Sequence, residues 1–334
     1  MSRVVITGGA GFIGSQLGFA LCDHHDVVLV DNMSSGYADN LVLDGKKFEN
    51  FILADVRDKK IYEIVDGADY VFHFAGISAL PTNQEDPQAA VSNNVAGTAN
   101  VLDACRYTGV KKFIFASTSA IYENNDVFPC SESDVVNPDL IYAITKLQSE
   151  LLCKSFSSVY DLETVCLRFF NVYGPHQDFR RKSPPLMGYI IKELMANRSP
   201  LLHSDGKQRR DYVYIDDLIE LMSIVMLKED ISGETFNVCS GSTISVEEIF
   251  NKIKSNMGVD VDAIYRDPHL LWEKYPTLYS GKRVLSKERL EKEVNKFALG
   301  NPEKTKRVLG WEAQVQMQEG IEKTIEYALS IGEK

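Results

Sequence analysis

Short runs of apolar residues, many of them β-branched or aromatic, recur along the first half of the chain. Each run is apolar throughout and does not alternate with polar residues, which is typical of strands that are buried on both faces. The runs cover residues 3–7, 26–31, 51–55, 70–75, 112–117 and 164–170. Segments of helical length separate them, and we expect helices at 11–24, 58–66, 86–108 and 139–159. This alternation predicts an α/β fold built on a mainly parallel, doubly wound sheet.

The pattern becomes less regular after about residue 172. The segment 173–185 is rich in proline and charge, and later apolar runs are irregularly spaced. We therefore expect residues 1–172 to form one domain, which segments within 211–240 rejoin, and residues 173–334 to form a smaller mixed α/β lobe. Because no Gly/Ser-rich linker separates the two parts, they should pack together around a cleft.

The composition is that of an ordinary globular protein: of 334 residues, 44% are hydrophobic and 25% are charged. The net charge of −11 disfavours a surface that neutralises phosphates over a long footprint, so we expect no nucleic-acid partner. The first apolar run is too short for a signal peptide, and no stretch of about 18 apolar residues predicts a membrane span. The six cysteines show no metal-ligand spacing, so we expect a cytoplasmic protein with buried thiols.

A glycine-rich segment, TGGAGFIGS, follows the first predicted strand directly. Its residues Gly8, Gly11 and Gly14 are spaced by three positions and lead into a predicted helix. Glycine lets the backbone turn sharply and lets a pyrophosphate approach the unpaired N–H groups at the N-terminus of that helix. A strand before the glycines and a helix after them are the context that this motif requires, so the segment predicts a dinucleotide site.

Two acidic residues at strand ends refine that prediction. The second strand ends in Asp31, whose carboxylate can accept hydrogen bonds from the ribose diol of an adenosine. A 2′-phosphate would meet a like charge there, so we expect NAD and not NADP. Asp55 ends the third run and, together with Val56, is placed to hold the adenine edge.

The segment YAITK places Tyr142 and Lys146 four residues apart, on one face of a predicted helix. An ammonium group near a phenol favours the phenolate, so we expect the pKa of Tyr142 to fall from about 10 toward neutrality and make it a general base. Thr118 closes the strand before this helix and can hydrogen-bond the same substrate hydroxyl. With NAD as the hydride acceptor, these groups suffice to oxidise a secondary alcohol.

These motifs resemble the extended short-chain dehydrogenase/reductase family, in particular its NAD-dependent nucleotide-sugar epimerases and dehydratases of the UDP-glucose 4-epimerase type. Seven motifs in the family's order carry the resemblance: TGGAGFIGS (7–15), HFAG (73–76), NNVAGT (93–98), ASTSAIYE (116–123), YAITK (142–146), RFFNVYGP (168–175) and DGKQRRDYVYIDD (205–217). The resemblance implies a Rossmann-type fold, bound NAD and a UDP-sugar substrate. It also implies a homodimer that helices 86–108 and 139–159 form.

The resemblance assigns roles to the matching residues. It implies that Thr118, Tyr142 and Lys146 are catalytic. Substrate contacts are implied for Ser78, Thr118, Ser119, Asn171 and Arg210, with Asn171 on the diphosphate and Arg210 on a phosphate of UDP. Cofactor contacts are implied for Gly8, Gly11, Phe12, Ile13, Gly14, Asp31, Asn32, Asp55, Val56, Phe74, Ala75, Gly76, Asn94, Tyr142, Lys146, Phe170 and Val172.

Two positions after Thr118 narrow the reaction. The family's 4,6-dehydratases carry Asp and Glu at the positions that match Ser119 and Ala120, and its UDP-glucuronate decarboxylases carry Glu at the second. This chain has neither carboxylate. Elimination and decarboxylation by those routes therefore lack their acid–base groups. Oxidation at C4 needs only Thr118, Tyr142, Lys146 and NAD, and the three residues are present. We expect an epimerase that acts on a UDP-sugar through a transient 4-keto intermediate.

Three alternatives remain open. The same residues would serve C5 epimerisation or 5,6-dehydration of a UDP-4-keto amino sugar, because the ketone itself acidifies the C5 proton. A reductase that consumes NADH would show net cofactor turnover. A regulator that binds NAD and a nucleotide-sugar without catalysis is disfavoured, because both Tyr142 and Lys146 are retained.

Two arginine-containing segments lie outside the motifs. In residues 263–297, Arg283 and Arg289 are candidates for a second phosphate- or ribose-binding arginine, but the charge pattern favours a solvated helical excursion. In the loop 173–185, Arg180 and Arg181 are candidates for an anionic sugar substituent, although a solvent-facing loop fits better. The six histidines, with His73 at a strand end, show no arrangement of metal ligands, so we expect no metal.

Overall fold

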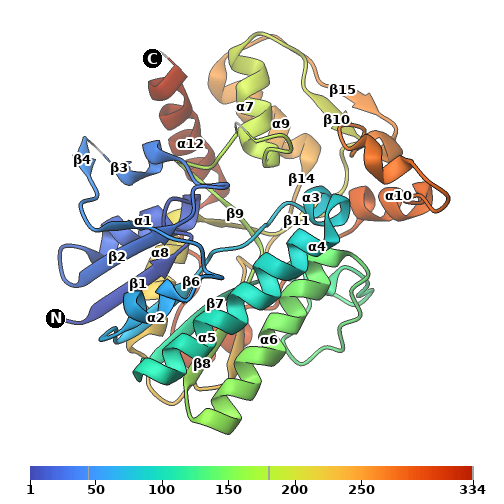
Figure 1. Ribbon diagram of the computed structural model, residues 1–334. Coiled ribbons are helices and arrows are strands. Elements are labelled where there is room, and N and C mark those ends of the chain that lie inside the picture. The colour runs from blue at the N-terminus through green and yellow to red at the C-terminus, as the bar shows by residue number, and fades with distance from the viewer. Residues whose placement is uncertain (44, 180, 333–334) are drawn as a thin grey trace.

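A parallel sheet runs through the centre of the computed structural model, which describes residues 1–43, 45–179 and 181–332 (Figure 1). Its strands are β1 (Arg3–Thr7), β2 (Asp26–Asp31), β5 (Phe51–Leu53), β6 (Tyr70–His73), β7 (Lys112–Thr118), β8 (Glu163–Phe169) and β13 (Glu234–Val238). The order across the sheet is β13-β8-β7-β6-β1-β2-β5. The first two predicted strands are confirmed at both ends, and the others are confirmed with small shifts of their ends.

The order of the strands reverses at β1. The chain proceeds from β1 to β2 and β5 on one side, and then crosses to β6, β7 and β8 on the other. In such doubly wound sheets, ligands bind at the carboxyl ends of the two strands that flank the reversal, here β1 and β6. The arrangement confirms the Rossmann-type fold predicted from the sequence.

Helices cover both faces of the sheet. α1 (Phe12–Leu21) and α8 (Ile215–Leu227) pack on one face, and α2 (Lys60–Val65), α5 (Gly97–Thr108) and α6 (Ile141–Tyr160) pack on the other. Val4 and Ile6 of β1 belong to the core that contains Leu17 of α1, whereas Val5 belongs to the core that contains Val101 of α5. Burial of each such side chain stabilises the fold by about 1.5–3 kcal/mol. Burial on two sides explains why the strand runs are apolar at every position.

The helix expected over residues 86–108 is divided into three parts. α4 (Pro87–Ala90) leads into a π-helical turn, η2 (Val91–Ala96), and then into α5. Asp86 caps α4 by accepting a hydrogen bond from the Ala89 N–H at 2.9 Å, as the Asp-Pro pair predicts. The π turn carries Asn94, and such turns occur frequently at functional sites.

A second lobe lies at the upper right in Figure 1. Its helices are α7 (Leu186–Met195), α9 (Val246–Met257), η4 (Pro268–Leu270), η5 (Pro276–Tyr279) and α10 (Lys287–Asn295). Its strands form the pairs β9 (Asn171–Tyr173) with β12 (Tyr212–Tyr214), β10 (Leu201–His203) with β15 (Ile264–Arg266), and β11 (Arg209–Arg210) with β14 (Ile244–Ser245). Between the second lobe's segments, β13 returns to the main sheet and pairs with β8.

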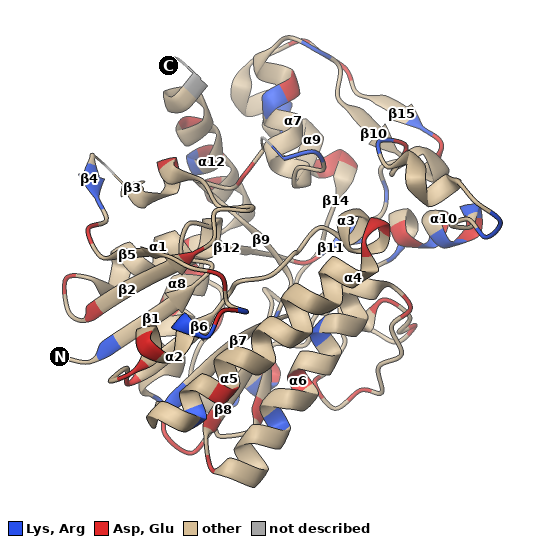
Figure 2. Cartoon of the chain, viewed as in Figure 1, with Lys and Arg blue, Asp and Glu red and all other residues tan. Residues whose placement is uncertain are grey.

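The remaining elements are short or terminal. They are η1 (Ala38–Leu41), β3 (Val42–Leu43), β4 (Lys46–Lys47), α3 (Leu80–Glu85), η3 (Ser119–Tyr122), α11 (Glu303–Leu309) and α12 (Met317–Gly332). Basic and acidic residues are interspersed over the outer helices and loops (Figure 2). Of the helices in the described part of the chain, none combines the length and apolarity of a membrane span.

Residues 263–297 are not the solvated excursion that their charge pattern favours. Trp272, Tyr275, Leu278 and Leu290 are buried in one cluster with Leu140. Leu140 immediately precedes α6, so the segment packs on the start of the helix that carries Tyr142. Charged residues and irregular turns separate these apolar positions along the chain, which is why no periodicity revealed them.

Candidate active site

The glycine-rich segment forms the turn between β1 and α1, as predicted. Gly8 has a left-handed φ of 72°, and a Cβ there would lie 2.7 Å from the backbone nitrogen of Ala75. A Cβ at Gly14 would lie 2.3 Å from the carbonyl oxygen of Gly8. Gly11 precedes α1, and no side chain of the described residues caps that end of the helix. The close approach of bare backbone and the unpaired N–H groups fit the pyrophosphate of a dinucleotide.

Asp31 lies at the end of β2, beside this turn. Its Oδ2 accepts a hydrogen bond from the N–H of Ala10 at 3.1 Å, and its Oδ1 accepts one from the N–H of Met33 at 2.8 Å. Burial raises the pKa of Asp31, although these hydrogen bonds oppose the rise. Each oxygen keeps a lone pair for a ribose hydroxyl, so the geometry is compatible with the predicted role.

Asn32 and Asp55 lie at the ends of neighbouring strands and are joined by a hydrogen bond of 2.8 Å. Arg57 donates to both carboxylate oxygens of Asp55 at 2.8 and 2.7 Å. This hydrogen bonding lowers the pKa of Asp55, so the carboxylate is ionised and fixed in direction. Val56 is buried, and a Cβ on Gly97 would lie 2.9 Å from its side chain. The adenine-edge role of Asp55 and Val56 stays a prediction.

The residues after β6 bring three elements together. A Cβ on Gly76 would lie 2.9 Å from Oδ1 of Asn94 and 3.8 Å from Nζ of Lys146. Asn94 accepts a hydrogen bond from the N–H of Ile77 at 2.8 Å and donates to the hydroxyl of Thr145 at 3.1 Å. Asn94 therefore connects the end of β6, the π turn and α6, which places Lys146 beside the predicted cofactor site.

Thr118 and Tyr142 meet at the carboxyl end of β7. Thr118 is the last residue of that strand, and Tyr142 lies in the first turn of α6. Burial raises the pKa of Tyr142, while hydrogen bonding to Thr118 and the charge of Arg181 oppose this rise. The predicted fall toward neutrality is therefore wrong for this structure. The reason is that burial dominates and that Lys146 is not among the groups whose charge acts on the phenol.

Lys146 is buried one helical turn after Tyr142. Its Nζ donates a hydrogen bond to the carbonyl oxygen of Ala116 at 2.8 Å and lies 4.8 Å from the ring centroid of Phe115. Burial lowers the pKa of Lys146 to about 8. The ammonium group is thus held between β7 and the end of β6 and is able to release its proton at mildly alkaline pH.

The hydroxyl groups of the ASTSAIYE segment have different surroundings. Ser117 donates a hydrogen bond to the Glu150 carboxylate in the interior, so it lies away from the site. Ser119 begins η3 and is partly buried. The Ala120 N–H donates to the hydroxyl oxygen of Thr118 at 3.1 Å. Thr118 is therefore the hydroxyl of this segment that contacts Tyr142.

Glu123, the last residue of that segment, is a buried residue that sequence analysis missed. Its Oε1 accepts hydrogen bonds from the N–H groups of Asp139 at 2.5 Å and Leu140 at 2.7 Å. Its Oε2 accepts one from Arg289 at 2.6 Å. Arg289 thus pairs with Glu123 and holds the start of α6, whereas Arg283, the other candidate, is exposed.

Arg181 lies in the site, so the solvent-facing position favoured by the sequence is wrong. Its Nη1 donates to the hydroxyl of Ser78, a predicted substrate contact, at 3.4 Å, and its Nε donates to the Ser183 carbonyl at 2.9 Å. Its charge acts on the phenol of Tyr142. Arg180, the other candidate in this loop, lies outside the described residues.

The predicted diphosphate-binding residues are held by backbone carbonyls. Asn171 donates from Nδ2 to the carbonyl of Asp211 at 2.8 Å. Arg210 donates to the carbonyls of Arg209 at 3.0 Å, Glu293 at 3.2 Å and Val294 at 2.9 Å. Those bonds leave the Nε–H and one Nη1–H of Arg210 for a ligand. Its phosphate contact stays a prediction.

The other predicted cofactor contacts are apolar. Phe170 is buried, and the rest are partly buried at the edge of the core: Phe12, Ile13, Phe74, Ala75 and Val172. Within the described chain, no group of His, Cys, Asp and Glu is arranged to hold a metal ion. The six cysteines are free thiols, of which Cys22 is partly exposed and the others are buried.

The chain is similar to known proteins along most of its length. A family model described as the NAD dependent epimerase/dehydratase family matches residues 4–239. A UDP-glucose 4-epimerase from Mycolicibacterium smegmatis is 31% identical over 97% of this chain and 98% of that protein. A UDP-N-acetyl-alpha-D-glucosaminuronate decarboxylase from Bacillus cytotoxicus is 35% identical over 75% of this chain and 79% of that protein. The solved structure of a Thermotoga maritima UDP-glucose 4-epimerase with UDP-glucose has a TM-score of 0.87 and 30% identity, and the match covers 98% of this chain and 99% of that one.

Proposed function

The chain belongs to the NAD-dependent epimerase/dehydratase family, and we propose that it is an epimerase that inverts C4 of a UDP-sugar. NAD is its cofactor and accepts and returns the hydride of C4 when bound. The observation that carries the proposal is the convergence of Thr118, Tyr142 and Lys146 at the carboxyl end of β7. The glycine turn after β1 supplies the dinucleotide site beside them.

Tyr142 is the base that takes the proton of the C4 hydroxyl. Thr118 is hydrogen-bonded to it and orients that hydroxyl, because a threonine oxygen both donates and accepts. Lys146 is buried one helical turn further along α6, next to the end of β6, where its ammonium group adds positive charge to the side of the site that would hold the cofactor. The same three groups return the proton after the transient 4-keto sugar has presented its other face.

The residues after Thr118 support epimerisation over elimination. Ser119 and Ala120 offer no carboxylate to protonate a leaving group or to abstract the C5 proton. The nearest carboxylate of the segment, Glu123, is committed to Asp139, Leu140 and Arg289. Redox-neutral chemistry at C4 therefore uses the groups that are present.

A nucleotide-sugar panel in D2O, followed by NMR, tests this proposal. We expect one UDP-sugar to convert to its C4 epimer with no solvent deuterium on carbon and no net change in nicotinamide absorbance. The variant Tyr142→Phe should lower kcat about 10²- to 10⁴-fold, which is the usual loss on removal of a general base. Deuterium at C5 would instead indicate C5 epimerisation or 5,6-dehydration, and a wholly unreactive panel would indicate a regulator.

We also propose which parts of the chain bind the cofactor and which bind the substrate. Residues 1–172, with a return of segments within 211–240, bind NAD, and most of residues 173–334 bind the nucleotide-sugar. The strand β13 in the main sheet supports the return. The free thiols support a reducing cytoplasm as the place of action.

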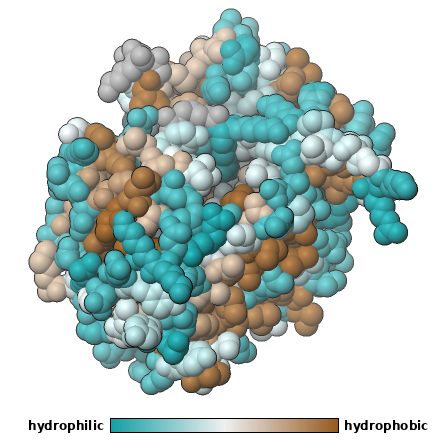
Figure 3. Space-filling view, viewed as in Figure 1, coloured by the Kyte–Doolittle hydropathy of each residue, from teal (hydrophilic) through white to brown (hydrophobic). Residues whose placement is uncertain are grey.

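We further propose a homodimer that forms through η2, α5 and α6. Large apolar side chains are exposed on these helices: Val91, Tyr107, Leu151, Val159 and Tyr160. Figure 3 shows hydrophobic surface over the region of α5 and α6. An exposed apolar surface of this kind on two adjacent helices is typical of a subunit interface.

A further inference from the structure

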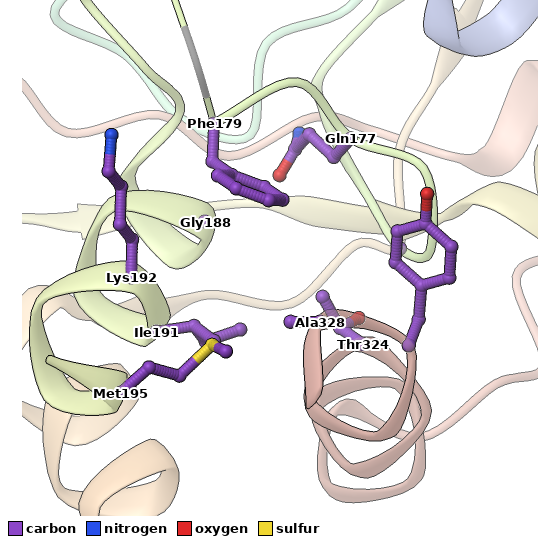
Figure 4. Close-up of a pocket in the computed structure, with 10 residues that line it drawn as sticks. Gln177, Phe179, Gly188, Ile191, Lys192, Met195, Thr324 and Ala328 are labelled. Atoms are coloured by element: carbon purple, nitrogen blue, oxygen red, sulfur yellow. The ribbon is translucent and has the colours of Figure 1, made fainter. Parts of the chain in front are cut away.

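The helices of the second lobe attach to different parts of the protein. α7 packs on α9 and α12, and Figure 4 shows Ile191 and Ala328 at the pocket between α7 and α12. α10 instead lies near the start of α6, where its Leu290 is buried in one cluster with Leu140. α10 therefore joins the second lobe to the residues just before Tyr142.

One carboxylate connects the two segments that carry Thr118 and Tyr142. Glu123 follows η3, the turn that begins directly after Thr118. Its Oε1 accepts hydrogen bonds from the N–H groups of Asp139 at 2.5 Å and Leu140 at 2.7 Å, directly before α6. Because this side chain holds both segments, the separation of the Thr118 and Tyr142 hydroxyls depends on Glu123.

Arg289 of α10 supplies the positive charge beside this carboxylate. Its Nη2 donates to Oε2 of Glu123 at 2.6 Å, and the two side chains are 15% and 0% exposed. Its Nη1 lies 3.5 Å from the carboxylate of Glu293, one turn later on α10. A phosphate would meet two like charges there. These contacts favour a partner of Glu123 over the phosphate-binding role for which Arg289 was a candidate.

Loss of the cation would disturb the start of α6. A buried carboxylate without its partner moves toward water or takes up a proton. Either change weakens the hydrogen bonds from Asp139 and Leu140, and Tyr142 lies in the helical turn that follows. Proton transfer requires the reacting groups within hydrogen-bond reach, and a misplacement of about 1 Å can slow a reaction about 10²-fold.

We propose that Glu123 and Arg289 are positioning residues, which hold Thr118 and Tyr142 in reach of each other and of the C4 hydroxyl without touching the substrate or NAD. This inference rests on the proposed epimerase function and adds residues that set its rate. A helix of the second lobe thereby controls proton transfer at the carboxyl end of β7.

Steady-state kinetics of Arg289→Met, with the UDP-sugar that the panel identifies, tests the proposal. The variant should lower kcat about 10- to 100-fold through misplacement of Tyr142. It should change KM less than about 3-fold, because Arg289 does not contact the substrate. Arg289→Lys retains the charge without the fork and should recover part of kcat. Glu123→Gln should also lower kcat, and the double variant should be little slower than Arg289→Met, because the two residues act as a unit.

Two control variants separate positioning from stability. Lys292→Met removes an exposed cation of the same helix and should leave kcat and KM unchanged. Ile253→Ala opens a cavity at a buried position of α9 and should lower stability without slowing the folded enzyme. If Ile253→Ala and Arg289→Met lower kcat equally, lost stability explains both and the proposal is overturned. It is also overturned if Arg289→Met raises KM and leaves kcat unchanged, because Arg289 would then bind the substrate.

Hydrogen exchange of the NAD-loaded protein, measured by mass spectrometry, distinguishes this proposal from the proposed function. Arg289→Met should speed exchange in residues 139–146 relative to α9, because two N–H groups of that segment donate to Glu123. If no sugar is converted but this segment exchanges faster, then epimerisation fails and the link from Arg289 to α6 stands. If sugars are epimerised and neither exchange nor kcat changes in Arg289→Met, then the positioning role fails and the epimerase stands.

Discussion

His73 ends β6 between two threonine hydroxyls. One ring nitrogen lies 2.7 Å from the hydroxyl of Thr7, and the other lies 3.0 Å from that of Thr98. Burial and, to a smaller extent, the charge of Lys146 lower the pKa of His73 to about 3. In the unfolded chain the pKa of His73 is about 6.5. Between about pH 3 and pH 6.5, His73 is therefore protonated in the unfolded chain but neutral in the folded protein. The contribution of His73 to the free energy of unfolding is therefore fully present above pH 6.5 and is lost as the pH falls toward 3.

Replacement of His73 should make the protein less sensitive to acid. Between pH 7 and pH 5 we expect His73 to account for a loss of about 2 kcal/mol in the free energy of unfolding. His73→Gln should be less stable than the wild type at pH 7, but its curve against pH should be shallower by that amount. Urea unfolding across this range checks it, with His24→Gln, an exposed histidine, as the control. Parallel curves for His73→Gln and the wild type would contradict the prediction.

The candidate site residues that the sequence indicated are those whose partners lie nearby or within one motif. Tyr142 and Lys146 share a helical face, and Thr118 closes the strand that leads toward them. Glu123 was not recognised, and Arg181 was named as a candidate but expected to face solvent, because the positions of both side chains depend on segments that only the tertiary fold brings together. The pKa of Tyr142 was also mispredicted, since spacing along a helix says nothing about burial.

At the scale of elements, α6 is held at its start by charge from the other lobe. The Glu123 carboxylate accepts hydrogen bonds from the N–H groups of Asp139 and Leu140, just before the helix begins. Arg289 of α10 pairs with the same carboxylate. The Glu123 side chain has no exposure and that of Arg289 is 15% exposed. Tyr142 follows this anchor directly, so its position depends on a contact between lobes.

A double-mutant cycle on this pair should reveal strong coupling. Arg289→Met leaves a buried carboxylate without its cation and should lower the free energy of unfolding by about 3 kcal/mol. Glu123→Gln should lower the free energy of unfolding much less in the Arg289→Met variant than in the wild type. We therefore expect urea unfolding to give a coupling energy of about 2 kcal/mol.

The surface pair Lys306 and Glu312, about half exposed on both sides, is the matched control. Its cycle should give less than about 0.5 kcal/mol. Equal coupling in the two cycles would show that the Glu123 contact is no more than a surface ion pair.

Most elements of the Rossmann-type half were predictable, because each apolar run had to be buried on both faces and each helix connected two parallel strands. The division of residues 86–108 by a π turn was not, since it depends on Asn94 reaching Ile77 and Thr145. The packing of residues 263–297 on Leu140 was not predictable either, because its apolar residues follow no helical or strand period.

At the scale of the molecule, the apolar surface on α5 and α6 predicts the state of assembly. Leu151 of α6 is 61% exposed, and Leu227 at the end of α8 is 63% exposed. Leu151→Glu should convert the proposed dimer into a monomer, because it would place charge in the proposed apolar interface, whereas Leu227→Glu should not. Light scattering coupled to size-exclusion chromatography measures both. A wild-type monomer, or equal effects of the two substitutions, would exclude this interface.

The return of β13 to the sheet limits how such a protein can be divided or recombined. Without β13, the first 172 residues would leave the seven-residue strand β8 as an exposed edge strand. Its unpaired N–H and C=O groups could then pair with a strand of another chain. We therefore do not expect residues 1–172, which contain the glycine turn and Tyr142, to form a stable domain by themselves. A chimera that exchanged the second lobe between relatives would succeed only if the incoming piece also supplied a strand that pairs with β8.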